Sequence, residues 1–269
     1  MLHEVLLGIG VGIALGLTGS GGVLAVPALM IGLGFSLPEA MPVALIAVGL
    51  SAFLGSIHGL SKGIVRYRAA IVMAAFGILC SPLGITLSHT LPNEILTLIF
   101  SLLLFWVALR MARQALVTQL LDTDKPFNHN CMLSPNTGRF RWNPRCFFTL
   151  SSIGGVSGLC SGMLGVGGGF LIVPGVRQFS NLKMHSIVAT SLAVIALIST
   201  GTVINALIAG AEISTQAWWF IGATTLGLLI GRMTAPKFPA KALQLGFALL
   251  ASLTSLMLLN RYILPFIWS

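Results

Sequence analysis

The sequence contains very little charge, because only 8% of its 269 residues are Asp, Glu, Lys or Arg and only 6 of those are acidic. Soluble globular domains usually carry about 25% charged residues, so this scarcity excludes an ordinary soluble domain. Hydrophobic residues make up 56% of the chain, and the mean hydropathy is +0.96. We therefore predict an all-α polytopic membrane protein, with room for roughly eight segments of about 20 residues.

Cysteine is scarce too. Cys80, Cys131, Cys146 and Cys160 show neither CxxC spacing nor a metal-ligand cluster with histidine, and we interpret His129 and Cys131 as solvated loop residues. We expect no structural disulfide, no metal and no cofactor. The net charge of +9 would suggest a nucleic-acid partner in a soluble protein, but here the basic residues lie between apolar runs and orient the chain in the membrane. No nucleic-acid partner is expected.

Glycine, by contrast, occurs 31 times and forms two clusters inside apolar runs. Gly19-Ser20-Gly21-Gly22 precedes Val26-Pro27, and Gly165-Val166-Gly167-Gly168-Gly169 precedes Val173-Pro174. Glycine clusters are costly within a helix, so we interpret both as breaks in the backbone at membrane depth. Scattered glycines are better explained by close helix packing, which needs spacing rather than adjacency: these are Gly8, Gly10, Gly12 and Gly16.

The two halves of the chain align at a constant offset of 147 residues from Pro27 onward, and the second copy has one extra residue upstream. The matched pairs are Pro27 with Pro174, Leu45 with Leu192, His58 with Asn205, Gly63 with Gly210, Gly84 with Gly231 and Pro92 with Pro239. A register held over about 65 residues indicates duplication. We predict a first transmembrane repeat at 1–118, a polar linker at 119–146 and a second transmembrane repeat at 147–269.

Each repeat divides into four elements. The glycine-broken elements are expected at about 3–35 and 147–176, and the helices at 39–60, 67–88, 93–117, 185–208, 215–233 and 241–265. The N-terminal run lacks the basic region and cleavage site of a secretory signal, so we expect it to be retained.

Basic residues occupy different connections in the two repeats. In the first repeat they follow the second element, as Lys62, Arg66 and Arg68. In the second repeat they follow the third element, as Arg232, Lys237 and Lys241. Opposite charge bias in equivalent loops indicates inverted repeats with the linker in the cytoplasm. Adjacent repeats invert only if each crosses the membrane an odd number of times, so one element of each must not cross fully.

We assign that role to the glycine-broken element. Its arms of roughly 15 residues and 8 to 12 residues are expected to be too short to span about 30 Å. The prediction is six full crossings, two re-entrant or discontinuous helices, and both termini outside. The alternative is eight full crossings with parallel repeats.

The glycine motif in both halves, together with Ala189-Thr190-Ser191-Leu192 after the second, resembles the TauE/SafE family of sulfite exporters and organosulfonate permeases. The resemblance covers nearly the whole chain. It implies a secondary transporter that moves small sulfur oxyanions or sulfonates across the bacterial inner membrane. The first repeat departs from the pattern, since it has a shorter glycine run and has Val43 and Ala44 where the second has Thr190 and Ser191.

The residues themselves point to an anion site. Glycines at a chain reversal expose backbone N–H groups, and a helix that starts there directs its positive dipole end to the same place. Inversion would bring two such N-termini together near mid-membrane, without a buried Lys or Arg. The predicted substrate-binding residues are Gly19, Ser20, Gly21, Gly22, His58, Gly167, Gly168, Gly169, Thr190, Ser191 and Asn205.

Polar side chains within membrane helices usually face the interior or a cavity. His58 and Asn205 are equivalent in the repeat, so we expect them to line the pathway, although a Ser or Thr hydroxyl can instead bond its own helix. Two other functions stay open: an anion channel, and an intramembrane hydrolase with a Ser20–His58 dyad. The second is disfavoured because Gly167, not a serine, is equivalent to Ser20. Small-residue stripes are compatible with a homodimer in the lipid membrane.

Overall fold

A computed structural model describes residues 2–18, 22–61, 63–117, 131–132, 143–180, 182, 184–208, 210, 215–234 and 240–260. The elements are α1 (Leu2–Thr18), η1 (Gly22–Leu24), α2 (Ala25–Leu33), α3 (Leu37–Ser61), α4 (Tyr67–Thr90), α5 (Asn93–Val117), α6 (Pro144–Leu164), α7 (Gly169–Phe179), α8 (Met184–Ile208), α9 (Thr215–Thr234) and α10 (Ala240–Leu258). The described part of the chain has no named strand, only an isolated bridge between Cys131 and Ser180. The all-helical prediction is therefore confirmed.

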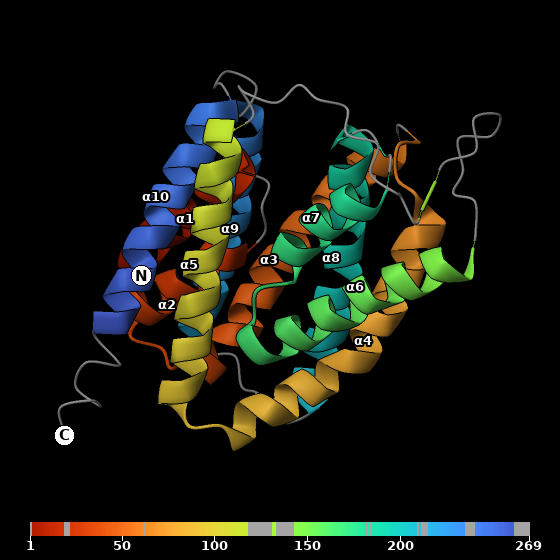
Figure 1. Ribbon diagram of the computed structural model, residues 1–269. Coiled ribbons are helices and arrows are strands. Elements are labelled where there is room, and N and C mark those ends of the chain that lie inside the picture. Colours follow the sequence, from red (N-terminus) through yellow and green to blue (C-terminus); the bar gives the residue numbers. More distant parts are fainter. Residues whose placement is uncertain are drawn as a thin grey trace.

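The helices pack in pairs that are distant in sequence (Figure 1). α1 packs along α9 and α5 along α10, and these four helices occupy one side of the molecule. α4 packs along α6 on the other side, and both are strongly inclined to α5 and α10. α3 and α8 pack against each other between the two sides, and α8 also contacts α4 while α3 contacts α9.

Among the described residues, five helices are long and apolar enough to cross a membrane, namely α3, α4, α5, α6 and α8. Large apolar side chains are exposed on their outer faces, such as Leu79 at 71% and Phe148 at 69%. A soluble protein would bury such side chains, whereas lipid accommodates them. The helices thus present a lipid-facing surface.

The glycine-broken element of the second half is longer than we predicted. α6 has 21 residues and qualifies as a membrane span, so the estimate of roughly 15 residues for this arm was wrong. The helix starts early because Pro144 occupies its first turn, where a missing N–H costs nothing. Residues 144–146, which we had placed in the linker, are therefore helical.

A disulfide joins Cys131 to Cys146 across 15 residues, which corrects our expectation of no structural disulfide. Both cysteines are fully buried. The Cys131 N–H also donates to the carbonyl oxygen of Phe179, at 3.0 Å. The spacing of the cysteines gave no sign of this contact because it depends on the linker folding back onto the end of α7. Cys131 thereby ties the first turn of α6 to the end of α7.

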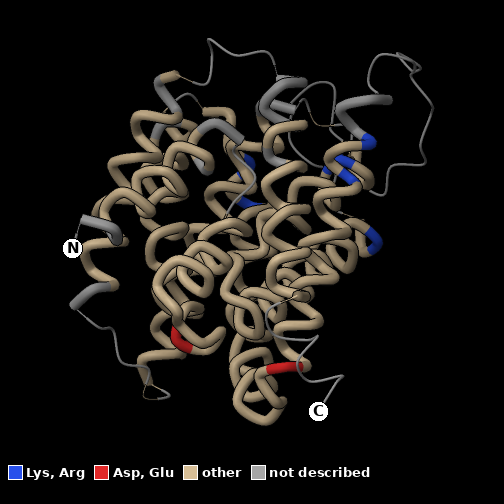
Figure 2. Tube along the Cα trace, turned by 90° about the vertical axis from the view of Figure 1, so that its left-hand side faces the viewer, with Lys and Arg blue, Asp and Glu red and all other residues tan. Residues whose placement is uncertain are grey.

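Charge is separated between the two ends of the molecule (Figure 2). The basic residues with described side chains lie toward one end, and the acidic residues with described side chains, Glu39 and Glu94, lie toward the other. The basic set is Arg66, Arg68, Arg110, Arg113, Arg145 and Arg177. The basic loop residues of the second half, Lys183, Lys237 and Arg232 among them, lie outside the described side chains.

Candidate anion site at the α6–α7 turn

The second glycine cluster forms a tight turn between α6 and α7. Gly165 ends α6 in the left-handed conformation with φ 71°, and Gly167 and Gly168 follow with φ 68° and 69°. Three left-handed residues in such a short turn are costly for any side chain with a Cβ, which explains the choice of glycine here. Every residue from 161 to 170 is buried. The turn therefore lies inside the protein rather than at its surface.

Space as well as conformation requires glycine at this turn. A Cβ on Gly168 would collide with the hydroxyl of Ser157 on α6, and that hydroxyl donates to the Gly168 carbonyl at 3.0 Å. A Cβ on Gly165 would lie 2.6 Å from the Cα of Met41 on α3. The turn is thus held closely between α6 and α3.

Several N–H groups of the turn have no backbone acceptor among the described residues. Gly165 donates to the Ser161 carbonyl, while Leu171 and Ile172 donate to the Gly168 carbonyl at 3.0 and 3.2 Å. None of the backbone bonds recorded for the described turn is donated by residues 166 to 170. These groups stand at the N-terminus of α7, where the helix dipole is positive. Such a terminus attracts anions.

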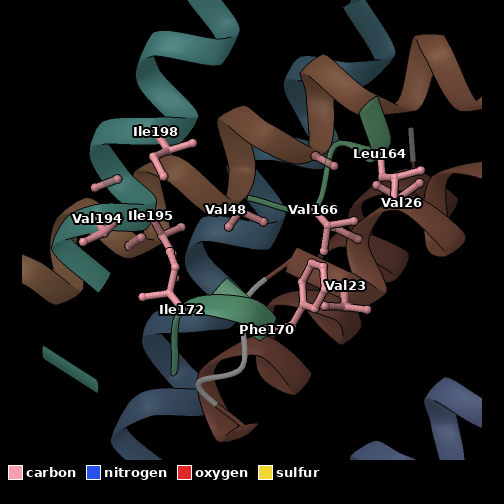
Figure 3. Close-up of a cluster of buried hydrophobic side chains, with 14 of the residues drawn as sticks. Val23, Val26, Val48, Leu164, Val166, Phe170, Ile172, Val194, Ile195 and Ile198 are labelled. Carbon is pink, nitrogen blue, oxygen red and sulfur yellow. The ribbon is translucent and has the colours of Figure 1, made fainter. Parts of the chain in front are cut away.

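The turn meets the middle of two long helices. A Cβ on Gly167 would lie 3.2 Å from Val48 of α3 and 3.3 Å from the hydroxyl of Ser199 on α8. A Cβ on Gly49, midway along α3, would lie 3.0 Å from the Cβ of the same Ser199. Figure 3 shows the apolar side chains that surround this place, with Val48 among them. The turn therefore lies inside the molecule, along α3 from Met41 to Val48 and beside the middle of α8.

The first glycine cluster approaches the same place. Gly19, Ser20 and Gly21 lie outside the described residues. Gly22 begins η1, and a Cβ on it would collide with the side chain of Val48. A Cβ on Gly167 would also meet Val48, so one described glycine of each cluster approaches the same position of α3.

Comparison with known proteins agrees with this architecture. Residues 5–258 match the family described as Sulfite exporter TauE/SafE. The chain belongs to the TauE/SafE family. No solved structure matches it.

Three relatives of this TauE/SafE protein are named as probable membrane transporter proteins. One from Xylella fastidiosa strain 9a5c is 29% identical over 232 residues, covering 86% of this chain and 83% of the relative. One from strain Temecula1 is 30% identical over 197 residues, with 72% and 69% covered. YjnA of Bacillus subtilis is 26% identical over 264 residues, with 95% and 98% covered. This chain is accordingly a multi-pass bacterial membrane transporter rather than an enzyme, and its family implies a small anion as substrate.

The other predicted site residues of this TauE/SafE chain lie along α8 and α3 rather than at the turn. Thr190 is buried, and its Oγ1 accepts a hydrogen bond from the Arg66 N–H at 3.0 Å, which ties the α3–α4 loop to α8. Ser191 donates to the Val188 carbonyl of its own helix at 2.9 Å. His58 lies in the last turn of α3, and its side chain is outside the described set.

Asn205 makes an interhelical contact. Its Nδ2 donates to the hydroxyl of Ser81 on α4 at 3.0 Å, and Ser81 donates in turn to the Ile78 carbonyl. Thr190 and Asn205 are separated by about 22 Å along α8, given a rise of 1.5 Å per residue. One small anion cannot contact both, so the structure does not gather the predicted residues into a single site.

Two buried hydroxyls near the turn were not among the predicted site residues. Ser161 and Ser199 are both 0% exposed, and neither hydroxyl has a hydrogen-bond partner among the described residues. Ser161 lies one helical turn before Gly165 on the same face of α6 as Ser157. The sequence marks Ser199 only as one of several hydroxyl residues in an apolar helix. Its contact with Gly167, which distinguishes it, is visible only in the fold.

Proposed function

We propose that this protein is a secondary transporter of small sulfur oxyanions or organosulfonates, and that the anion binds at the α6–α7 turn. The observation that carries the proposal is the buried run of N–H groups from 166 to 170 at the N-terminus of α7. Helix N-termini bind sulfate and phosphate in many proteins without a basic side chain. In discontinuous transporter helices the same arrangement holds anionic groups near mid-membrane.

We also propose that α6 and α7 form a re-entrant hairpin. The support is the position of Cys131, which is bonded through its sulfur to Cys146 near the start of α6 and through its N–H to Phe179 at the end of α7. The hairpin thus starts and ends on the same side of the molecule. α7 has only 11 residues, or about 16 Å, and is too short to span the bilayer alone.

Glycine contacts support the inverted repeats at 1–118 and 147–269. The packing of α1 on α9 repeats that of α6 on α4, with each residue replaced by its partner in the other half. Gly12 packs on the Thr224 carbonyl as Gly158 packs on the Gly77 carbonyl. In the same way, the contact of Gly8 with Phe220 matches that of Gly154 with Met73. The contact of Gly231 with Ile13 matches that of Gly84 with Leu159. Each contact therefore joins one repeat to the other, as a two-fold relation requires.

An anion channel is the competing function. Reconstituted protein in liposomes separates the two, because only a carrier drives uptake of labelled substrate by counterflow against unlabelled substrate inside. We expect uptake of at least one of sulfite, thiosulfate, sulfoacetate and taurine above that of protein-free liposomes. If none of them moves, or if all move equally and without exchange, the proposal is wrong.

The site is tested by a pair of glycine substitutions. Gly167→Ala places a Cβ in the turn with φ 68°, and Gly63→Ala places one in the α3–α4 loop with φ 64°, where nothing lies within 4 Å. Both changes impose a similar backbone cost of about 1–2 kcal/mol. We expect Gly167→Ala to reduce transport far more than Gly63→Ala. Equal effects would show that backbone strain alone is responsible.

A further inference from the structure

We propose that the α6–α7 turn and the hydroxyl of Ser199 form a binding site of neutral donors only, which accepts singly charged oxyanions and rejects doubly charged ones. This inference rests on the proposed function and specifies its substrate class. It would favour hydrogensulfite and organosulfonate head groups over sulfite dianion, sulfate and thiosulfate.

Ser199 is the group that turns the helix terminus into a site. It is 0% exposed, its hydroxyl has no partner among the described residues, and that hydroxyl lies 3.3 Å from the position of a Cβ on Gly167. Buried hydroxyls are nearly always hydrogen-bonded. A hydroxyl with no partner among the described residues, beside backbone N–H groups with no described acceptor, therefore supports a bound ligand at this place. An oxyanion oxygen would satisfy both kinds of donor.

The described arginines of α6 and α7 lie far along their helices from this place. Arg177 is the nearest on α7, eight residues after Gly169, or about 12 Å along the helix. Arg145 lies at the far end of α6, about 30 Å from Gly165 along that helix. Neither arginine can neutralise an anion held at the turn.

The other ionisable residues that lie on α3, α6 and α8 are an acid, a thiol and two histidines placed away from the turn along their helices. Glu39 is exposed, accepts the Ser36 N–H at 2.9 Å and lies two residues from Met41, which touches Gly165. Cys160 of α6 is a neutral thiol. His58 and His185, whose side chains are outside the described set, lie about 13 Å and 21 Å along α3 and α8 from Gly49 and Ser199.

Charge number then decides which anions bind. The Born cost of moving an ion into a low-dielectric interior rises with the square of its charge, so a dianion costs about four times as much as a monoanion of equal size. Attraction to the fixed dipoles of the N–H and O–H donors rises only in proportion to charge, about twofold. Without a buried cation, the cost of desolvation therefore exceeds the attraction to the donors by more for a dianion than for a monoanion. The apolar side chains around the turn, Val48 and Ile195 among them, add to this cost because they offer no further donors.

The test is the pH dependence of initial uptake rates into liposomes for three anions. Methanesulfonate is a monoanion and sulfate a dianion throughout the neutral range, whereas hydrogensulfite loses its proton within it. We expect sulfite uptake to fall as the pH rises, in proportion to the hydrogensulfite that remains, with a flat profile for methanesulfonate and no uptake of sulfate. Methanesulfonate is the control for proton coupling. If transport were coupled to protons, the uptake rates of both sulfite and methanesulfonate would fall as the pH rises, whereas loss of the hydrogensulfite monoanion lowers only the sulfite rate.

Sulfate uptake comparable to that of methanesulfonate, or sulfite uptake that rises with pH, would overturn the inference while leaving transport itself established. Absence of uptake for every anion would instead refute the proposed function. The two failures are therefore distinguishable.

Substitution of the hydroxyl provides an independent check. Ser199→Ala is expected to weaken apparent affinity for the transported anion about 10- to 100-fold, the effect of losing one hydrogen bond to a charged group. Ser199→Cys, of similar size but a weaker donor, should fall between. Thr224→Ala is the matched control, because Thr224 is also 0% exposed and unpartnered among the described residues but lies on α9 against α1. Equal affinities of the Ser199→Ala and Thr224→Ala variants would remove Ser199 from the site.

Discussion

The packing of α4 on α6 and of α1 on α9 predicts a matched pair of destabilising substitutions. A Cβ on Gly158 would collide with the carbonyl of Gly77, and a Cβ on Gly12 with the carbonyl of Thr224. Backbone atoms cannot rotate away as a side chain can, so the helices must separate. We expect overpacking of this kind to cost about 1–3 kcal/mol in each variant.

Control glycines on the same helices isolate that cost. Gly10 of α1 has nothing within 4 Å, and a Cβ on Gly155 of α6 would meet only the thiol sulfur of Cys80 at 3.3 Å. Alanine at any of these helical positions gains up to about 1 kcal/mol of helix propensity, and this gain cancels in the comparison. Gly10→Ala should therefore be as stable as the wild type or slightly more stable.

The measurement is the apparent melting temperature in detergent micelles, where each kcal/mol corresponds to about 2–4 °C for a chain of this size. Gly12→Ala and Gly158→Ala should melt several degrees below their controls, and by similar amounts. If both match Gly10→Ala and Gly155→Ala, the close packing is refuted. A large drop in only one of the pair would refute their equivalence in two repeats.

Three further predictions concern other parts of the chain. Cys131→Ser should lower the free energy of unfolding by about 3 kcal/mol, the entropic estimate for a 15-residue loop. A reductant should lower the stability of the wild type by the same amount and leave that of the variant unchanged. A double-mutant cycle between Asn205→Ala and Ser81→Ala should give a coupling of about 0.5–2 kcal/mol in denaturation experiments, and no coupling would exclude the α4–α8 hydrogen bond. In a background without other free thiols, Glu94→Cys should react with a membrane-impermeant thiol reagent added to intact cells. Arg68→Cys should not react, because positively charged loops stay in the cytoplasm. Labelling of Arg68→Cys but not of Glu94→Cys would instead place the disulfide-bonded end of the molecule outside the cell.

Most of the helical architecture could be predicted from the sequence because membrane helices are long apolar runs bounded by polar or turn-forming residues. The expected helix at 67–88 extends to Thr90, and the one at 39–60 covers Leu37–Ser61. The start of α6 was missed because Arg145 and its neighbours look like loop residues, while Pro144 in fact opens the helix. Polarity marks where a helix leaves the hydrocarbon, not where its hydrogen bonds begin.

The glycine turn was also legible in the sequence, since adjacency of glycines has no explanation in helix packing. Its chemistry was less so. Ser191 and Ser199 are both serines in the same apolar helix, yet Ser191 bonds the Val188 carbonyl whereas Ser199 has no described partner. A serine can bond its own helix at almost any position. Only the approach of Gly167 from another element distinguishes the second serine from the first.

The separation of charge along the molecule fits the proposed transport of an anion through a neutral centre. The described arginines lie toward one end (Figure 2), where they raise the local concentration of anions without binding one tightly. A lysine or arginine at the turn would hold the anion more strongly and would slow its release, since passage requires binding that is weak enough to leave. Backbone N–H groups and one hydroxyl bind an anion less strongly than a basic side chain would, and they carry no charge of their own that must be desolvated. A site of this kind at the proposed turn would bind the anion less tightly than a basic side chain would, and it would release the anion faster and discriminate against dianions.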